Sequence, residues 1–171
     1  MLLDTSTFTT PGSFAVGPSG STAMPTALRV PGATLLVAPQ ATAAAAEMGL
    51  KSLRGQKSPG RRVAWFNVTE LSRTPGVDLA ALGRRMVQEA DAALVVVCGQ
   101  GAREVALGAR DAGLALGRVV VCRDEATARN VLGDSIAADD TVLAFGINMD
   151  GCQRLADRLE SRFSRQLAGA C

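Results

Sequence analysis

Residues 93–113 read ALVVVCGQGAREVALGARDAG, and they set the pattern for most of the chain. The apolar, β-branched run over 93–98 predicts a strand that is buried on both faces of a sheet. Two glycines follow this run, and residues 101–113 then carry the apolar spacing of three and four that is typical of a surface helix. The stretch therefore predicts one strand-turn-helix unit of an α/β fold.

The same unit recurs on both sides of this stretch. Further strands are predicted at 33–38, 62–67, 118–122 and 141–145, with helices at 40–55, 77–90, 124–136 and 150–167. Parallel strands need crossover connections, and right-handed crossovers place helices over the sheet. We expect a Rossmann-like three-layer α/β sandwich over residues 28–171, a single domain with a mostly parallel sheet of about five strands and helices on both faces.

Residues 1–27 have a different composition. They are rich in Thr, Ser, Gly and Pro and follow neither hydrophobic period, which predicts an irregular N-terminal arm. Apolar side chains such as Phe8, Phe14 and Val16 leave two interpretations open. The arm is either disordered or docked as a strap on its own or another subunit.

Composition excludes several classes of function. The chain has 171 residues with 18 Lys and Arg against 16 Asp and Glu, so its net charge of +2 gives no sign of a nucleic-acid partner. It contains no histidine, which removes the Ser-His-Asp triad and the imidazole switch. The aromatic content of 4% is poor for base-stacking platforms.

The cysteines and the N-terminus predict the compartment. Cys98, Cys122, Cys152 and Cys171 form no C-x-x-C pair, so we expect neither a zinc site nor a redox motif, only small apolar side chains in a reducing environment. The N-terminus lacks a signal peptide, and no apolar stretch reaches the length of about 18 residues that a membrane span needs. We expect a cytoplasmic protein with no metal, no cofactor and no membrane partner.

The glycine turn is the strongest local sign of a ligand site. Gly99, Gln100, Gly101 and Arg103 follow the strand at 93–98, where backbone amides at a helix start can meet a phosphate. Glu104 stands at the position of the third glycine of the dinucleotide fingerprint, so a plain strand-to-helix connection is the competing interpretation.

Other polar residues are predicted beside this turn. Asn67, Thr69, Gly146 and Asn148 lie at the ends of neighbouring strands, and the carboxyl ends of parallel strands share one edge of a sheet. One hypothesis is thus a binding protein for a nucleotide or a nucleotide-sugar, in which a bulky residue at position 101 blocks the ligand without unfolding the chain.

The order of elements resembles the C-terminal domain of the Mur ligases, above all the ligase that adds D-alanyl-D-alanine to the peptidoglycan precursor. The resemblance covers about residues 28–160. It is carried by the strings PGATLLVAPQATAAAAEMGLKSL, PGRRVAWFNVTELS, VDLAALGRRMVQEADAALVVVCGQGAREVALGARDAG and ADDTVLAFGINMDGCQRLADRL. It implies the scaffold of that domain.

The departures from the family pattern argue against its activity. Residues 37–44 stand where the family has an Asp-Asp-x-Tyr-Asn-Ala-Asn-Pro-like stretch, and Leu79 stands in place of a histidine. Asn67-Val68-Thr69 replaces a Gly-Asp-Met turn, and Phe145-Gly146-Ile147 replaces Lys-Gly-Ser. The chain also has no G-x-x-x-x-G-K-[ST] phosphate loop.

Three hypotheses follow for function. The first is a stand-alone, non-catalytic relative of the Mur ligase C-terminal domain. It would be an interaction or structural module that contacts another protein or its own copies, through its arm or through Val37, Ala38 and the alanines at 43–46. The second is the nucleotide or nucleotide-sugar binder described above. The third is a subunit of a split peptide ligase. It is less favoured because the chain lacks residues that could position the incoming amine. Whether the chain is an enzyme stays open, and the residues favour the absence of enzyme activity.

Overall fold

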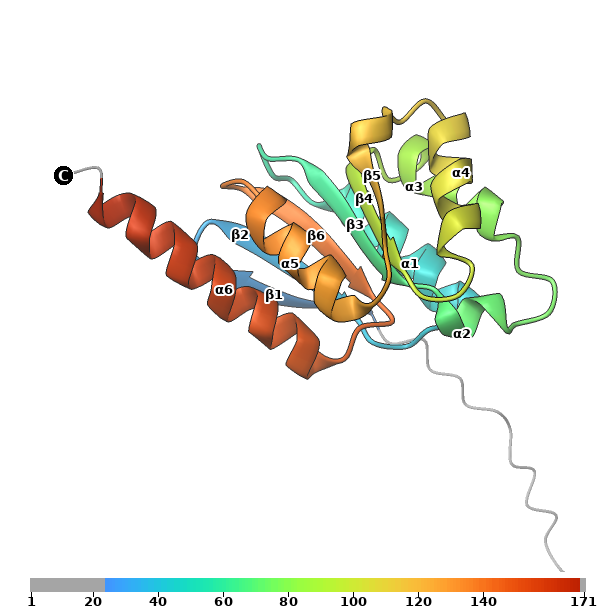
Figure 1. The fold of residues 1–171 in the computed structure, drawn as a ribbon, viewed down its shortest axis with the longest axis horizontal. Coiled ribbons are helices and arrows are strands. Elements are labelled where there is room, and N and C mark those ends of the chain that lie inside the picture. The colour runs from blue at the N-terminus through green and yellow to red at the C-terminus, as the bar shows by residue number, and fades with distance from the viewer. Residues whose placement is uncertain (1–23, 170–171) are drawn as a thin grey trace, which may run out of the picture.

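Six strands form one sheet in the order β1-β2-β6-β3-β4-β5 in the computed structural model, which describes residues 24–169 (Figure 1). The strands are β1 (Thr26–Val30), β2 (Ala33–Ala38), β3 (Arg62–Asn67), β4 (Ala92–Cys98), β5 (Val119–Cys122) and β6 (Asp140–Phe145). The helices are α1 (Ala43–Gly55), α2 (Thr69–Ser72), α3 (Leu79–Gln88), α4 (Ala102–Asp111), the 3-10 turn η1 (Leu116–Arg118), α5 (Glu125–Ser135) and α6 (Met149–Ala168). The predicted Rossmann-like α/β fold is confirmed.

The strand β1 was not predicted, so the sheet has six strands where about five were expected. It pairs antiparallel with β2, and Val30 opposite Ala33 closes the hairpin. Gly32, which follows Pro31, has φ +77°, a conformation that suits glycine in a tight turn. Because β1 begins at Thr26, regular structure starts two residues inside the predicted arm of residues 1–27, and residues 1–23 lie outside the described part of the chain.

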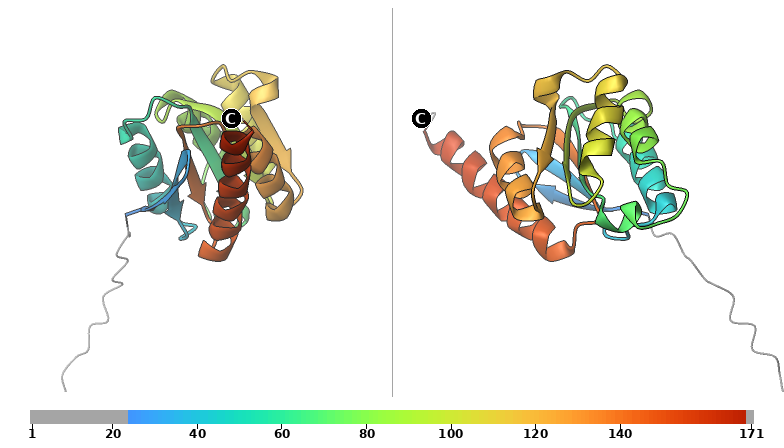
Figure 2. Two further views of the ribbon diagram at one scale, coloured as in Figure 1. Left: turned by 90° about the vertical axis from the view of Figure 1, so that its left-hand side faces the viewer. Right: turned by 45° about the vertical axis from the view of Figure 1, so that its right-hand side comes forward.

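All other strand pairs are parallel, and the helices lie in two layers (Figures 1 and 2). On one face α1, α3 and α4 pack against a core that contains Leu50, Phe66 and Phe145. On the other face α5 and α6 pack against a second core, which contains Trp65 and Val142 from the sheet and Leu132 from α5. The three-layer sandwich follows from crossovers that run in opposite directions along the sheet.

Side-chain caps fix where the main helices begin. The side chains of Thr42, Asp78 and Asp124 accept hydrogen bonds from the backbone amides of Ala45, Ala81 and Thr127, at 3.1, 2.8 and 2.8 Å. Short polar side chains at this position satisfy amides that have no partner within the helix. These bonds lower the pKa of the Asp124 carboxyl below its ordinary value.

Two expectations bear on the chain's surroundings. Within residues 24–169, no helix combines the length and the apolar character that crossing a membrane requires. In the same range, no cluster of three or more His, Cys, Asp or Glu side chains is arranged to hold a metal ion.

Candidate functional site

The ends of three neighbouring strands bring most of the predicted polar residues together. Because β6, β3 and β4 are adjacent, Gly146, Asn67 and Gly99 meet at one edge of the sheet. A methyl group added at Gly146 would lie 2.7 Å from the Asn67 carbonyl oxygen, and one added at Gly99 would lie 2.8 Å from Asn67 Oδ1 and overlap Thr69. The structure therefore places Asn67, Gly99 and Gly146 at one edge of the sheet, as predicted from the sequence.

These groups bond to one another rather than face an open cavity. The Oδ1 atom of Asn67 accepts hydrogen bonds from Thr69 N at 3.2 Å and from Thr69 Oγ1 at 2.9 Å. Asn148 is engaged elsewhere, because its Oδ1 accepts the backbone amide of Gly151 at 2.7 Å in the first turn of α6. Asn67, Thr69 and Asn148 thus act in the structure as local turn and helix-start residues.

The glycine turn opens on a different hollow. Gly99 and Gly101 have φ of +93° and +83°, and α4 begins at Ala102 without a side-chain cap. A hollow of about 530 Å³ lies between this turn and the end of β5, lined by Gly99, Gly101, Ala102, Arg103, Glu104, Val121, Cys122 and Arg123. Three of the eight predicted residues therefore line it, and Gln100 stands exposed beside them.

Sequence reasoning missed Arg123 and Val121. Arg123 directly follows the predicted strand at 118–122, and that position at a carboxyl end was the signal that could have found it. Arg103 and Arg123 form no ion pair with any described residue, so the hollow carries two free cations and the carboxylate of Glu104. The two arginines would attract an anionic ligand, and the carboxylate of Glu104 would weaken that attraction.

The structure adds a cost to bulk at position 101 that the sequence-based expectation left out. Gly101 has φ +83°, which side chains rarely adopt, and an added methyl group would overlap Leu79 and lie 3.1 Å from the Ser72 Cβ. Substitution there strains the backbone and the α3 contact together. Arg103 and Arg123 are the cleaner positions for testing the hollow.

Two cysteines lie at the hollow: Cys122 lines it, and Cys98 is the neighbour of Cys122 on β4. Cys98 and Cys122 are opposite each other in the β4–β5 pair, and both are buried with their thiols free. Burial, with a smaller contribution from Glu125, raises the pKa of Cys98 and of Cys152 from 9.0 to about 12. The predicted role of these three cysteines as buried apolar side chains is confirmed, and Cys171 lies outside the described residues.

We expect Cys98, Cys122 and Cys152 to resist alkylation by iodoacetamide at pH 8 and to react fully once the chain is unfolded in guanidinium, because a thiol must be deprotonated and accessible to react. Intact-mass spectrometry counts the adducts, and peptide mapping separates these cysteines from Cys171. The native pKa of about 12 lies above the ordinary 9.0, so the free energy of unfolding falls as pH rises through this interval. Rapid native labelling at any of the three would contradict this burial.

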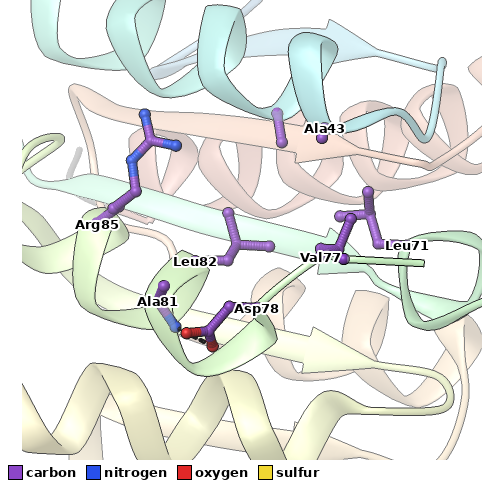
Figure 3. A pocket seen from close by; sticks show the side chains of 9 residues that line it. Ala43, Leu71, Val77, Asp78, Ala81, Leu82 and Arg85 are labelled. Atoms are coloured by element: carbon purple, nitrogen blue, oxygen red, sulfur yellow. Dashed lines mark hydrogen bonds between the residues drawn. The ribbon is translucent and has the colours of Figure 1, made fainter. Parts of the chain in front are cut away.

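A second, apolar pocket of about 250 Å³ lies between α1 and α3 (Figure 3). Ala43, Leu71, Val77, Ala81 and Leu82 are among the residues that line it. Its charged groups already have partners: Asp78 caps α3, and Arg85 pairs with Glu89 at 2.8 Å. The pocket therefore offers little polar chemistry for orienting a ligand.

The surface predicted around the alanine run is mostly core. Val37 and Ala38 are buried on opposite faces of the sheet at the end of β2, and Ala45 and Ala46 are buried on the side of α1 that packs against the sheet. Within the run 43–46 only Ala43 and Ala44 are exposed. Self-association through this segment as an apolar patch is not supported by the packing.

A third hollow, of about 250 Å³, lies at the margin of the sheet beside β5. It is lined by Arg103, Ala106, Leu107, Arg110, Leu116, Val119 and Val121. Leu107, Leu116 and Val121 are exposed by 55, 70 and 45%. We call this set of seven residues the β5 edge patch.

The chain matches no family model and no curated protein. Among solved structures it is similar to a domain assigned to a UDP-N-acetylmuramate:L-alanyl-γ-D-glutamyl-meso-diaminopimelate ligase of Haemophilus ducreyi, with a TM-score of 0.50, 18% identity and coverage of 78% of this chain and 93% of that one. It is also similar to the UDP-N-acetylmuramoylalanyl-D-glutamyl-2,6-diaminopimelate–D-alanyl-D-alanyl ligase of Acinetobacter baumannii, with a TM-score of 0.54, 16% identity and coverage of 80 and 28%. The MurF ligase of Thermotoga maritima in complex with ADP gives a TM-score of 0.57, 13% identity and coverage of 86 and 33%.

These similarities define the class of fold. The chain has the α/β fold of a Mur ligase domain, and the matches fall in the C-terminal domain region of those ligases. The predicted resemblance is thus confirmed at the level of fold. The chain spans 28% and 33% of the length of the two larger ligases.

Proposed function

We propose that this chain is an interaction module built on the Mur ligase C-terminal fold, which binds a partner protein and performs no ligation itself. The observation that carries the proposal is the β5 edge patch, where Leu107, Leu116 and Val121 are exposed together beside the outermost strand of the sheet. Contiguous exposed apolar side chains at a rim of charge are typical of binding surfaces.

The carboxyl edge of the sheet supports the same proposal. Ligand sites in open α/β sheets use polar groups that project from strand ends. Here Asn67 and Thr69 bond to each other, and the backbone of Gly99 closes on them. Groups that are already paired have little to offer a reacting substrate.

The test is a thermal-unfolding panel with ATP, ADP, UDP, UDP-sugars and UDP-muramoyl peptides, each with and without magnesium. We expect no shift of the unfolding temperature with any of them. A ligand at 100 times its Kd would add about 2.7 kcal/mol to the free energy of unfolding, which corresponds to roughly 5–10 °C for a chain of this size. A shift of that size with one nucleotide class would overturn the proposal.

The second candidate is a binder of an anionic small molecule such as a nucleotide or a nucleotide-sugar. The hollow of about 530 Å³ beside Arg103 and Arg123 favours it, because its volume lies in the range of small-molecule sites. In this case the panel would show a shift that Arg123→Glu removes and that Arg29→Glu, an exposed change on β1, leaves intact.

A further inference from the structure

The outer edge of β5 has no strand partner among the described residues. β5 ends the sheet opposite β1, and its far side faces away from β4 (Figures 1 and 2). A strand at a sheet edge presents unpaired backbone N–H and C=O groups that can pair with another extended chain.

Side chains around this edge form one surface. Val119 and Val121 are two residues apart on β5, so both side chains lie on the same side of the sheet, the side that carries α4. Arg103, Leu107 and Arg110 follow at spacings of four and three on α4, so they share one helix face. A strand added to β5 would place every second side chain against these residues.

Four arginines surround this surface: Arg103 and Arg110 on α4, and Arg118 and Arg123 at the two ends of β5. None of the four pairs with a carboxylate of the described chain. Most other described arginines are paired, as Arg61 is with Asp140 and Arg158 with Asp134, and the unpaired ones are otherwise scattered, at Arg29, Arg162 and Arg165. The edge therefore combines an apolar centre with four arginines that form no ion pair, although the carboxylates of Glu104 and Asp124 lie near two of them.

We propose that β5 and the adjoining face of α4 bind an extended acidic segment of a partner protein, which adds to the sheet as a seventh strand. This rests on the proposed function and names its surface and the chemistry of its partner. The segment alternates apolar residues, which cover Leu107 and Val121, with carboxylates at both ends. The two arginines flank the four residues of β5, so the carboxylates of the segment are placed five residues apart, which spans about 16 Å in an extended segment.

A second copy of the chain fits this edge poorly. In antiparallel self-pairing that uses all four residues of β5, Arg118 of one copy lies opposite Arg123 of the other at both ends. Like charges directly opposite each other destabilise a strand pair. An acidic segment turns the same two positions into attractive pairs.

The test measures fluorescence anisotropy of the labelled peptide Glu-Val-Thr-Val-Val-Glu, and of the same peptide with lysine for glutamate, titrated with the full chain. We expect the acidic peptide to bind at least tenfold more tightly than the basic one. Proline is placed in the acidic peptide either at the threonine or at the valine that follows it, and at least one of the two changes abolishes binding, because alternate backbone amides of an added strand bond to β5. The double variant Arg118→Glu/Arg123→Glu reverses the preference toward the lysine peptide.

The matched control is Arg29→Glu, which changes an exposed arginine on β1 at the other edge of the sheet and should leave both affinities unchanged. Circular dichroism verifies that each variant is folded. Equal or absent binding of the two peptides, or equal loss in Arg29→Glu, overturns the edge proposal. So does a dimer, measured by light scattering, that Val121→Lys dissociates. A failed peptide assay with a silent nucleotide panel overturns strand addition by an acidic segment and leaves the β5 edge patch to a partner of other chemistry, whereas a nucleotide shift overturns the proposed function.

Discussion

Replacing Gly108 by alanine is expected to lower the free energy of unfolding by roughly 2–3 kcal/mol, close to the upper range for added bulk in a packed interior. α3 and α4 pack directly on each other, and an added methyl group at Gly108 would lie 2.9 Å from the Ala80 Cα and overlap the Ala80 carbonyl. Backbone atoms cannot rotate away as a side chain can, so the helices must separate. This outweighs the gain of about 1 kcal/mol in helix propensity.

Urea denaturation followed by Trp65 fluorescence measures this effect, because Trp65 is the only tryptophan and is fully buried. Gly55→Ala is the matched control: Gly55 is also helical, and an added methyl group meets nothing within 4 Å. We expect it to be neutral or slightly stabilising. A Gly108 variant as stable as the Gly55 variant would contradict the close packing of α3 on α4.

Gly83 makes the reciprocal contact from α3, where an added methyl group would lie 2.8 Å from Ala109 N. Once one methyl group has separated the helices, the second enters space that is already open. The double variant Gly83→Ala/Gly108→Ala should therefore lose less stability than the two single losses added together. Because α4 carries Arg103 and Leu107, these variants should also lower the affinity for any ligand that binds at the β5 edge patch.

Buried strands and their following helices could be predicted because their patterns are local. Runs such as 93–98 are apolar throughout, and caps such as Asp124 mark a helix start within a few residues. β1 escaped prediction because TALRV is largely exposed and has no clean period, although the Pro31-Gly32 pair between two apolar runs is a hairpin signal. The four-residue helix α2 is too short to show a helical period.

The candidate site divides in the same way. That Asn67, Gly99 and Gly146 share an edge follows from parallel strands, and this much the sequence predicts. Whether their polar atoms face a ligand or each other depends on side-chain orientation, which no period encodes. The β5 edge patch depends on strand order, because the same VVVC run would be covered if β5 were a central strand.

The second large effect is expected at Asp140, whose side chain is 1% exposed at the start of the central strand β6. Its Oδ1 accepts the Arg61 backbone amide at 2.8 Å, and its Oδ2 accepts Arg61 Nη2 at 2.7 Å and the Ala137 amide at 2.8 Å. The bond to Asp140 raises the pKa of the Arg61 guanidinium, so Arg61 stays charged. Asp140→Ala leaves the backbone amides of Arg61 and Ala137 without an acceptor and Arg61 Nη2 with the Ser135 carbonyl alone, at a cost of about 3 kcal/mol.

Asp140→Asn should cost nearly as much, although it keeps the volume. Both carboxylate oxygens accept from donors, so an amide NH₂ must point at Arg61 or at the Ala137 amide in either orientation. The control is Asp91→Asn: Asp91 also pairs with two arginines, Arg54 and Arg62, but its side chain is 65% exposed. Asparagine tolerates the φ of +54° there, and exposed pairs contribute less than about 1 kcal/mol. Equal stability losses at 140 and 91 in urea denaturation would show that burial does not make the Asp140 network strong.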